Sequence, residues 1–212
     1  MLRDAFKMTN EALCNTPGLD VRFSGSTCVS VLTFGKKIYV ANVGDSRAIL
    51  IRQGKQQNQF EVAALTRDHK PCDPLEGQRI ITSGGRVDSY RDAHGNKVGP
   101  DRVWVKDEDL PGLAMSRSFG DMVACTVGVN AIPECREVTL CAEDKVIVLA
   151  SDGVWEFMSN EEVANVVYPF YLQRNAEKAA ETLVRTAFKR WKGQETYSVD
   201  DITCIVVFIE AK

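Results

Sequence analysis

The sequence lacks the features that mark a membrane protein, a secreted protein or a nucleic-acid-binding protein. Its longest apolar run, residues 202–209, has the length of a strand and is too short to span a membrane. The N-terminal residues Met-Leu-Arg-Asp-Ala-Phe contain no apolar core of a signal peptide. The formal net charge is only −3, which argues against a basic nucleic-acid surface. We therefore expect neither a membrane nor a nucleic acid as partner.

Cysteine and histidine do not occur in metal-binding or disulfide patterns. The seven cysteines are an odd number without a C-x-x-C spacing, and the only histidines are His69 and His94. A zinc site is therefore not expected. Free thiols indicate a reducing compartment, so the expected location is intracellular, cytoplasmic or nuclear. Cys28, Cys125 and Cys204 have apolar neighbours and are expected to be packed thiols.

The remaining composition is typical of one globular domain over residues 1–212. Hydrophobic residues make up 44% and charged residues 26%, which is ordinary for a folded protein. A chain of this length can bury a sizeable core without disulfides or a structural metal. It contains no internal repeat and no low-complexity segment.

Helical periodicity and capping signals predict several helices. Asp73 can cap a helix, Pro74 suits its first position, and Glu76 completes a capping box three residues after the cap. Ser159 and Glu162 form a second capping box. The helices are expected over residues 2–13, 73–83, 159–168 and 175–191, with a shorter helical stretch near 116–123.

Short β-rich segments joined by tight turns predict strands. They are expected over residues 26–34, 38–43, 48–52, 60–65, 145–150 and 202–209. The first four are joined by turns that allow only antiparallel neighbours, which favours a meander. Residues 86–112 are expected to form a long irregular excursion. Strands in hairpins with segregated helices indicate an antiparallel sheet core covered by helices, an α+β fold.

Acidic residues stand at the ends of two apolar segments. Asp152 follows the strand predicted over residues 145–150, and Asp200 precedes the strand predicted over residues 202–209. Antiparallel neighbours would bring both carboxylates to one sheet edge, where a shared Mg²⁺ or Mn²⁺ would relieve their repulsion. Asp45 is a third candidate ligand. Spacing alone leaves open that these residues only form turns or caps, and Asp201 is expected to be a solvated neighbour.

A colinear series of segments makes the chain resemble the metal-dependent Ser/Thr protein phosphatases of the type 2C (PPM) family. Each segment alone is weakly specific, but their order over nearly the whole chain is highly specific. The segments are SGST at 24–27, ANVGDSR at 41–47, LTRDHKP at 65–71, SGG at 83–85, PGLAMSRSFGD at 111–121, ASDGVW at 150–155 and DDIT at 200–203.

The resemblance implies a fold and an activity. The fold is a β-sandwich flanked by helices in α-β-β-α layers, with residues 86–112 as a flap beside the active site. The activity is hydrolysis of phosphoserine and phosphothreonine in phosphoproteins by a water that two Mg²⁺ or Mn²⁺ ions activate. Asp152 and Asp200 match metal ligands of the family, and Asp45 matches an aspartate associated with a weaker third metal.

Other residues match supporting positions of the family. They are Gly153, Asp201, Glu156, Arg117 and Asp121. We expect Arg117 and Asp121 to form a pair that positions the flap, and Glu156 stands where many members have Asp. His69 is expected to be structural because it precedes a capped helix, and Trp155 is expected in the core.

The chain also departs from the family pattern. It contains no D-G-H-G motif, and its single His-Gly pair is His94-Gly95, inside the expected flap. The family's general-acid histidine and phosphate-binding arginine are therefore not identifiable. We expect an N-terminally incomplete domain whose unpaired sheet edges could promote association.

These departures leave several hypotheses open. The first is that the chain is part of an active phosphatase, shortened by an alternative start or a gene-model error. Alternatively, it is an inactive relative that binds phosphoproteins or a partner phosphatase through its flap. An unrelated structural domain would require the ordered motifs to be a coincidence. The sequence does not name a substrate, a regulator or the metal used in the cell.

Overall fold

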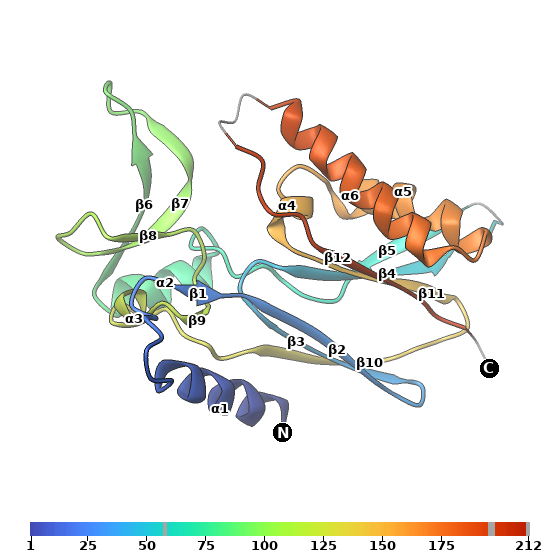
Figure 1. Ribbon diagram of the computed structural model, residues 1–212, viewed down its shortest axis with the longest axis horizontal. Helices are drawn as coiled ribbons and strands as arrows, with labels where there is room; N and C mark the ends of the chain where they lie inside the picture. Colours follow the sequence, from blue (N-terminus) through green and yellow to red (C-terminus); the bar gives the residue numbers. More distant parts are fainter. Residues whose placement is uncertain (57–58, 195–197, 211–212) are drawn as a thin grey trace. The chain divides into compact units, whose positions relative to one another are not determined.

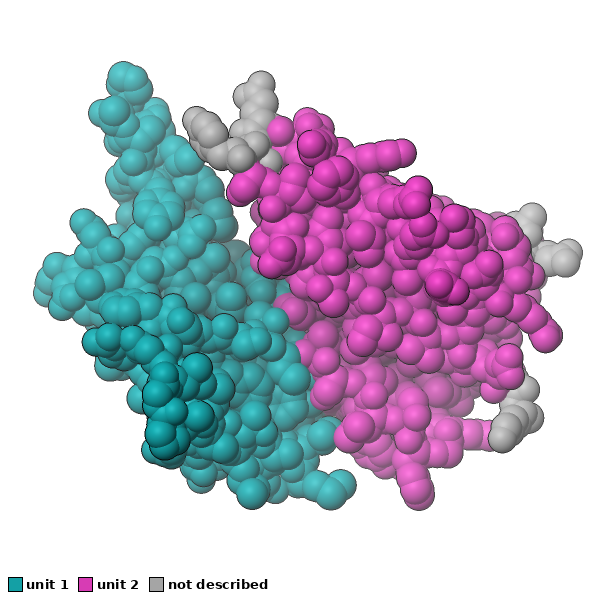
Figure 2. Space-filling model, viewed as in Figure 1, with its two compact units in different colours: residues 1–28, 41–45, 68–135 teal, residues 29–40, 46–67, 136–212 magenta. Residues whose placement is uncertain are grey.

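The computed structural model describes residues 1–56, 59–194 and 198–210. The chain divides into two compact units, coloured teal and magenta in Figure 2. The first unit combines residues 1–28, 41–45 and 68–135, and the second combines residues 29–40, 46–67 and 136–212. Because the backbone passes repeatedly from one unit to the other, neither unit is a continuous segment.

The second unit is a β-sandwich with helices on one sheet (Figure 1). One sheet has the order β12-β11-β4-β5 and contains β4 (Arg47–Gln53), β5 (Phe60–Ala64), β11 (Asp144–Ala150) and β12 (Cys204–Phe208). The other has the order β10-β3-β2 and contains β2 (Cys28–Phe34), β3 (Lys37–Val43) and β10 (Glu134–Thr139). The helices are α4 (Asp152–Trp155), α5 (Asn160–Leu172) and α6 (Ala176–Lys192).

Successive side chains along β4 and β11 point to opposite faces of the sheet and so enter two different hydrophobic cores. Ile49 and Val148 lie on the face that packs against α5 and α6. Leu50 and Ile147 lie on the opposite face and pack with Ile38 of β3 in the sandwich interior. Strands apolar on both faces are expected where a sheet is covered on both sides, which explains the nearly continuous apolar sequence of these strands.

The first unit is built from short elements. They are α1 (Leu2–Cys14), β1 (Gly25–Ser26), α2 (Pro74–Thr82), β6 (Gly85–Arg91), β7 (Lys97–Val105), β8 (Pro111–Leu113), β9 (Phe119–Gly120) and α3 (Met122–Cys125). α1 packs through Phe6 against Phe119 and the end of β3. Ile80 of α2 packs with Val103 of β7 in a separate cluster. Each cluster is small, so polar networks contribute substantially to holding this unit together.

The main expectations about the fold are confirmed. The structure is α+β, its long helices lie where periodicity and capping predict them, and the Ser159–Glu162 capping box is present. Trp155 is buried in the core, and its indole nitrogen donates to the Ala150 carbonyl at 2.9 Å. Cys28, Cys125 and Cys204 are partly buried, and burial raises the pKa of each thiol.

Other expectations about the fold are wrong. The meander breaks at residues 44–46, because β3 and β4 belong to different sheets. Residues 86–112 are not irregular but form most of the three-stranded sheet β6-β7-β8. The helix expected near 116–123 is reduced to α3, because residues 119–120 pair with β1 instead. Local propensity cannot show which of these segments finds a strand partner elsewhere in the chain.

Candidate functional site

The two acidic segments predicted at strand ends lie at the same end of one sheet. β11 and β12 are antiparallel neighbours, with Ala150 opposite Cys204. Asp152 is the first residue of α4, separated from the end of β11 by Ser151, and Asp200 precedes β12. Antiparallel pairing therefore brings the two segments together, as expected from the sequence.

Hydrogen bonds tie these two segments to each other. The Ser151 amide donates to the Thr203 carbonyl at 3.0 Å, and the Ser151 hydroxyl donates to the Asp201 carbonyl at 3.2 Å. The Thr203 amide in turn donates to the Ser151 hydroxyl at 3.2 Å. These contacts hold the backbone on either side of Asp152 in register with the backbone that follows Asp200.

Gly153 is required by the close approach of the two segments. A Cβ atom at this position would lie 2.3 Å from the Asp201 carbonyl oxygen, a distance that no side chain tolerates. The Gly153 carbonyl accepts a 2.7 Å hydrogen bond from the indole nitrogen of Trp191 on α6. Gly153 and Asp201 therefore act through their backbones, and the Asp201 side chain is exposed, as is that of Glu156.

Asp45 lies in a different setting. Its side chain is only 3% exposed, and it forms an ion pair with the Lys70 ammonium, which is 27% exposed. Asp45 belongs to the turn that follows β3, and Lys70 lies just before α2. A carboxylate that already faces a protein cation is a poor match for an additional metal ligand.

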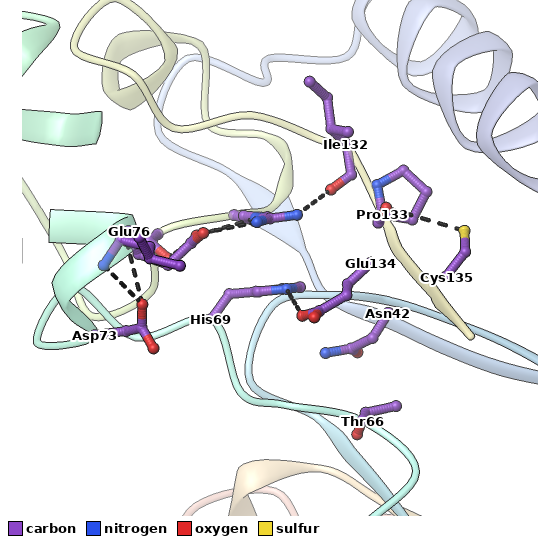
Figure 3. A network of polar contacts seen from close by, with 12 residues as sticks. Asn42, Thr66, His69, Asp73, Glu76, Ile132, Pro133, Glu134 and Cys135 are labelled. Carbon is purple, nitrogen blue, oxygen red and sulfur yellow. Dashed lines mark hydrogen bonds and ion pairs between the residues drawn. The ribbon is translucent and has the colours of Figure 1, made fainter. Parts of the chain in front are cut away.

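The neighbouring residue His69 is bonded both to the same turn and to Glu134, and Figure 3 shows the contact with Glu134. The Gly44 amide donates to His69 Nδ1 at 3.1 Å, and the His69 amide donates to the Gly44 carbonyl at 3.0 Å. His69 Nε2 faces Glu134 Oε2 at 3.3 Å, which assigns the ring proton to Nε2. Burial, followed by the charge of Arg117, lowers the pKa of this fully buried histidine. Neutral, enclosed and bonded at both ring nitrogens, His69 has the features of a structural residue.

A comparison with known families identifies the chain. The family model for protein phosphatase 2C matches residues 2–194. The chain belongs to the protein phosphatase 2C family. Curated relatives include "Probable protein phosphatase 2C 52" of Arabidopsis thaliana, 40% identical over 98% of this chain and 43% of the relative. "Probable protein phosphatase 2C 64" of Oryza sativa subsp. japonica is 37% identical over 98% of this chain and 47% of the relative.

Solved structures show the same fold. The serine-threonine phosphatase 2C from Toxoplasma gondii superimposes with a TM-score of 0.84 at 25% identity, over 99% of this chain and 66% of that one. The structure of a C. elegans sex determining protein superimposes with a TM-score of 0.73 at 21% identity, over 98% of this chain and 46% of that one. The chain spans about half the length of the curated relatives it matches.

The metal centre known for protein phosphatase 2C fits these residues only in part. Asp152 and Asp200 have the donor type that Mg²⁺ and Mn²⁺ prefer, and Mg²⁺ often binds through one or two carboxylates with several waters. Over residues 1–56, 59–194 and 198–210, no group of three or more His, Cys, Asp or Glu side chains is placed to hold a metal ion. By donor type Asp152 and Asp200 suit such an ion, and Asp45 forms an ion pair with Lys70.

Glu76 accepts a network of hydrogen bonds that the sequence does not predict. Its buried carboxylate accepts from both Arg79 and Arg117 in two-point contacts of 2.6–3.0 Å, and from the Ser116 hydroxyl at 2.6 Å. The Asp73 side chain caps α2 as predicted, but Glu76 does not complete the capping box. Two arginines far apart in sequence cannot be assigned to one carboxylate from spacing alone.

The expected pair of Arg117 and Asp121 is wrong. Arg117 binds Glu76 and the Ile132 carbonyl, the latter at 2.8 Å. Asp121 instead lies buried at the start of α3 with a left-handed backbone, φ 48°, and its amide donates to the Ser24 carbonyl. Burial raises the pKa of Asp121 because it removes solvent from the carboxylate.

No helix of the described residues is both long and apolar enough to cross a membrane.

Proposed function

We propose that this chain contributes one half of a metal-dependent Ser/Thr phosphatase site. Asp152 and Asp200 are the proposed metal ligands, and phosphoserine and phosphothreonine in phosphoproteins are the proposed substrates. The observation that carries the proposal is the antiparallel pairing of β11 and β12, which puts both aspartate segments at one sheet end in a member of the protein phosphatase 2C family.

In this proposal, residues of the chain hold the two metal-binding aspartates in place and supply their negative charge. Bound Mg²⁺ or Mn²⁺ would lower the pKa of a water and offset the charge of the phosphate oxygens. The contacts of Ser151 with residues 201–203 hold the two aspartate segments at a defined separation. Rigid placement matters because phosphoryl transfer depends mainly on positioning and electrostatic stabilisation.

The direct test is hydrolysis of a phosphothreonine peptide by the 212-residue chain and by a longer form that supplies the remaining part of a phosphatase 2C domain. We expect activity that depends on Mn²⁺ or Mg²⁺, and a loss of at least about 100-fold in Asp152→Asn or Asp200→Asn. Asp4→Asn, at an exposed position of α1, is the matched control and should retain activity. An active Asp152→Asn/Asp200→Asn double variant would sink the assignment.

A second candidate is a non-catalytic binding role of the flap. Tyr90 and Val98 are opposite each other on β6 and β7 and are about half exposed. The Arg102 guanidinium stacks over the Tyr90 ring at 5.0 Å, and Trp104 meets that ring edge-on at 5.2 Å. A rigid aromatic side chain beside a cation is a common feature of protein interfaces.

This alternative is tested by the binding of fluorescent phosphothreonine peptides and of an active phosphatase 2C domain to the catalytically inert Asp152→Asn/Asp200→Asn variant. We expect binding that falls about tenfold in Tyr90→Ala, since a central aromatic contact is worth about 1–2 kcal/mol. Leu75→Ala, on an exposed position of α2, is the control. If Tyr90→Ala binds as tightly as the parent, the flap is not the binding surface.

A further inference from the structure

The turn that follows β3 contains a carboxylate and its own cation. Asp45 is almost completely buried, and the Lys70 ammonium contacts its Oδ2 atom. An isolated buried carboxylate would be strongly unfavourable, so this carboxylate needs a partner that is always present. Lys70 meets that need from within the chain.

The residues on either side reinforce the pairing. His69 binds both the amide and the carbonyl of Gly44, and the Asn42 side chain also donates to the Gly44 carbonyl, at 3.0 Å. Gly44 has φ 96°, and a Cβ atom there would lie 2.4 Å from the Thr27 side chain. His69 and Lys70 therefore hold Gly44 and Asp45 through one backbone–backbone hydrogen bond, one hydrogen bond from the Gly44 amide to the His69 ring, and one ion pair.

From this geometry we propose that Asp45 is a structural anion held by Lys70 and not a ligand of a third metal. The built-in ammonium takes the place that a divalent cation would need at this carboxylate. The inference rests on the proposed function only in its comparison with Asp152 and Asp200. The chain then binds metal only at the end of the sheet where β11 and β12 pair. The turn after β3 keeps its structure without metal.

The first test is a double-mutant cycle on the metal-free 212-residue chain, measured by urea unfolding. We expect Asp45→Asn and Lys70→Met to be coupled by about tenfold or more in the folding equilibrium constant. The exposed pair Lys37–Glu137, at 2.5 Å, is the matched control and should show a coupling of about twofold in Lys37→Met/Glu137→Gln. If Asp45→Asn alone does not fold, Asp45→Asn/Lys70→Met should fold better than that single variant. Additive effects of the two substitutions would overturn the pairing.

The second test measures Mn²⁺ binding to the folded variants by the electron paramagnetic resonance of the free ion. We expect Asp45→Asn and Lys70→Met to bind Mn²⁺ within about twofold of the parent chain, and Asp152→Asn to lose binding. A tenfold weaker affinity in Asp45→Asn together with a tighter affinity in Lys70→Met would show that Asp45 is a ligand that Lys70 blocks. A parent chain that binds no Mn²⁺ would contradict the metal part of the proposed function, and the mutant cycle would still decide the role of Asp45.

Discussion

The carboxyl group of Glu76 makes the stability of the first unit depend on pH. Its burial raises the pKa of the carboxyl, but hydrogen bonds from Arg117, Arg79 and Ser116 lower it far more, so the net pKa lies well below its usual range. A carboxyl with a depressed pKa stabilises the fold above its unfolded pKa of about 4.3. That stabilisation is lost as the pH falls through the depressed value.

We therefore expect the free energy of unfolding to decline below about pH 4.5, with a shallower decline in Glu76→Gln. At pH 7, Glu76→Gln should cost about 3 kcal/mol, because two arginines lose a buried carboxylate. Urea unfolding between pH 3 and pH 7 measures both effects. Identical pH slopes in the parent chain and Glu76→Gln would contradict this role.

At Tyr168 we expect a substitution to stabilise the fold, in contrast to Glu76→Gln. Its ring is 3% exposed and packs against Phe60 and Tyr171, but its hydroxyl has no hydrogen-bond partner among the described residues. Removing a buried, unsatisfied hydroxyl removes a desolvation cost, so Tyr168→Phe should stabilise the chain by about 1 kcal/mol. Thermal unfolding of this variant, with Tyr171→Phe as control, is the measurement. A lower unfolding temperature would mean that the hydroxyl does have a partner.

At the scale of elements, β12 is a sheet edge without protection. It carries no charged residue and no proline, and Ile205 and Val207 are 57% and 42% exposed. Natural edge strands usually carry charge or bulges that prevent pairing with another chain. We therefore predict that the association through sheet edges expected from the sequence occurs at β12.

We expect the 212-residue chain to associate with rising concentration and Ile205→Lys/Val207→Lys to remain monomeric. Lysine at exposed positions of an edge disfavours pairing without disturbing the core. Light scattering coupled to size-exclusion chromatography distinguishes the two, with Leu75→Lys as a control for added charge elsewhere. A parent chain that is monomeric at every concentration would refute the prediction.

At the scale of the whole molecule, the boundary between the two units runs through continuous strands. β3 gives residues 37–40 to one unit and residues 41–43 to the other. The two halves of β3 are one continuous piece of backbone, so unfolding of one half removes the ordered backbone next to the other. We therefore expect a single cooperative unfolding transition. Hydrogen exchange in a urea series should give residues 37–40 and 41–43 the same opening free energy. Two different opening energies would show independent units.

The sequence alone was sufficient for the long helices, the apolar strands and the family. Periodicity and capping are local properties, which is why the Ser159–Glu162 capping box was recognisable and α6 was predicted to within one residue at each end. The ordered motifs were enough to identify a protein phosphatase 2C relative, later matched over residues 2–194. The sequence also offered the pairing of the strands that carry Asp152 and Asp200 as one possibility, and β11 and β12 are antiparallel neighbours.

Tertiary structure decided what depends on distant partners. Only the fold shows that β3 and β4 enter different sheets, that Arg117 binds Glu76 rather than Asp121, and that Lys70 pairs with Asp45. A charged side chain can reach many partners of similar local sequence, and the choice among them is made by burial and backbone direction. These are properties of the folded chain, which is why spacing along the sequence could not predict them.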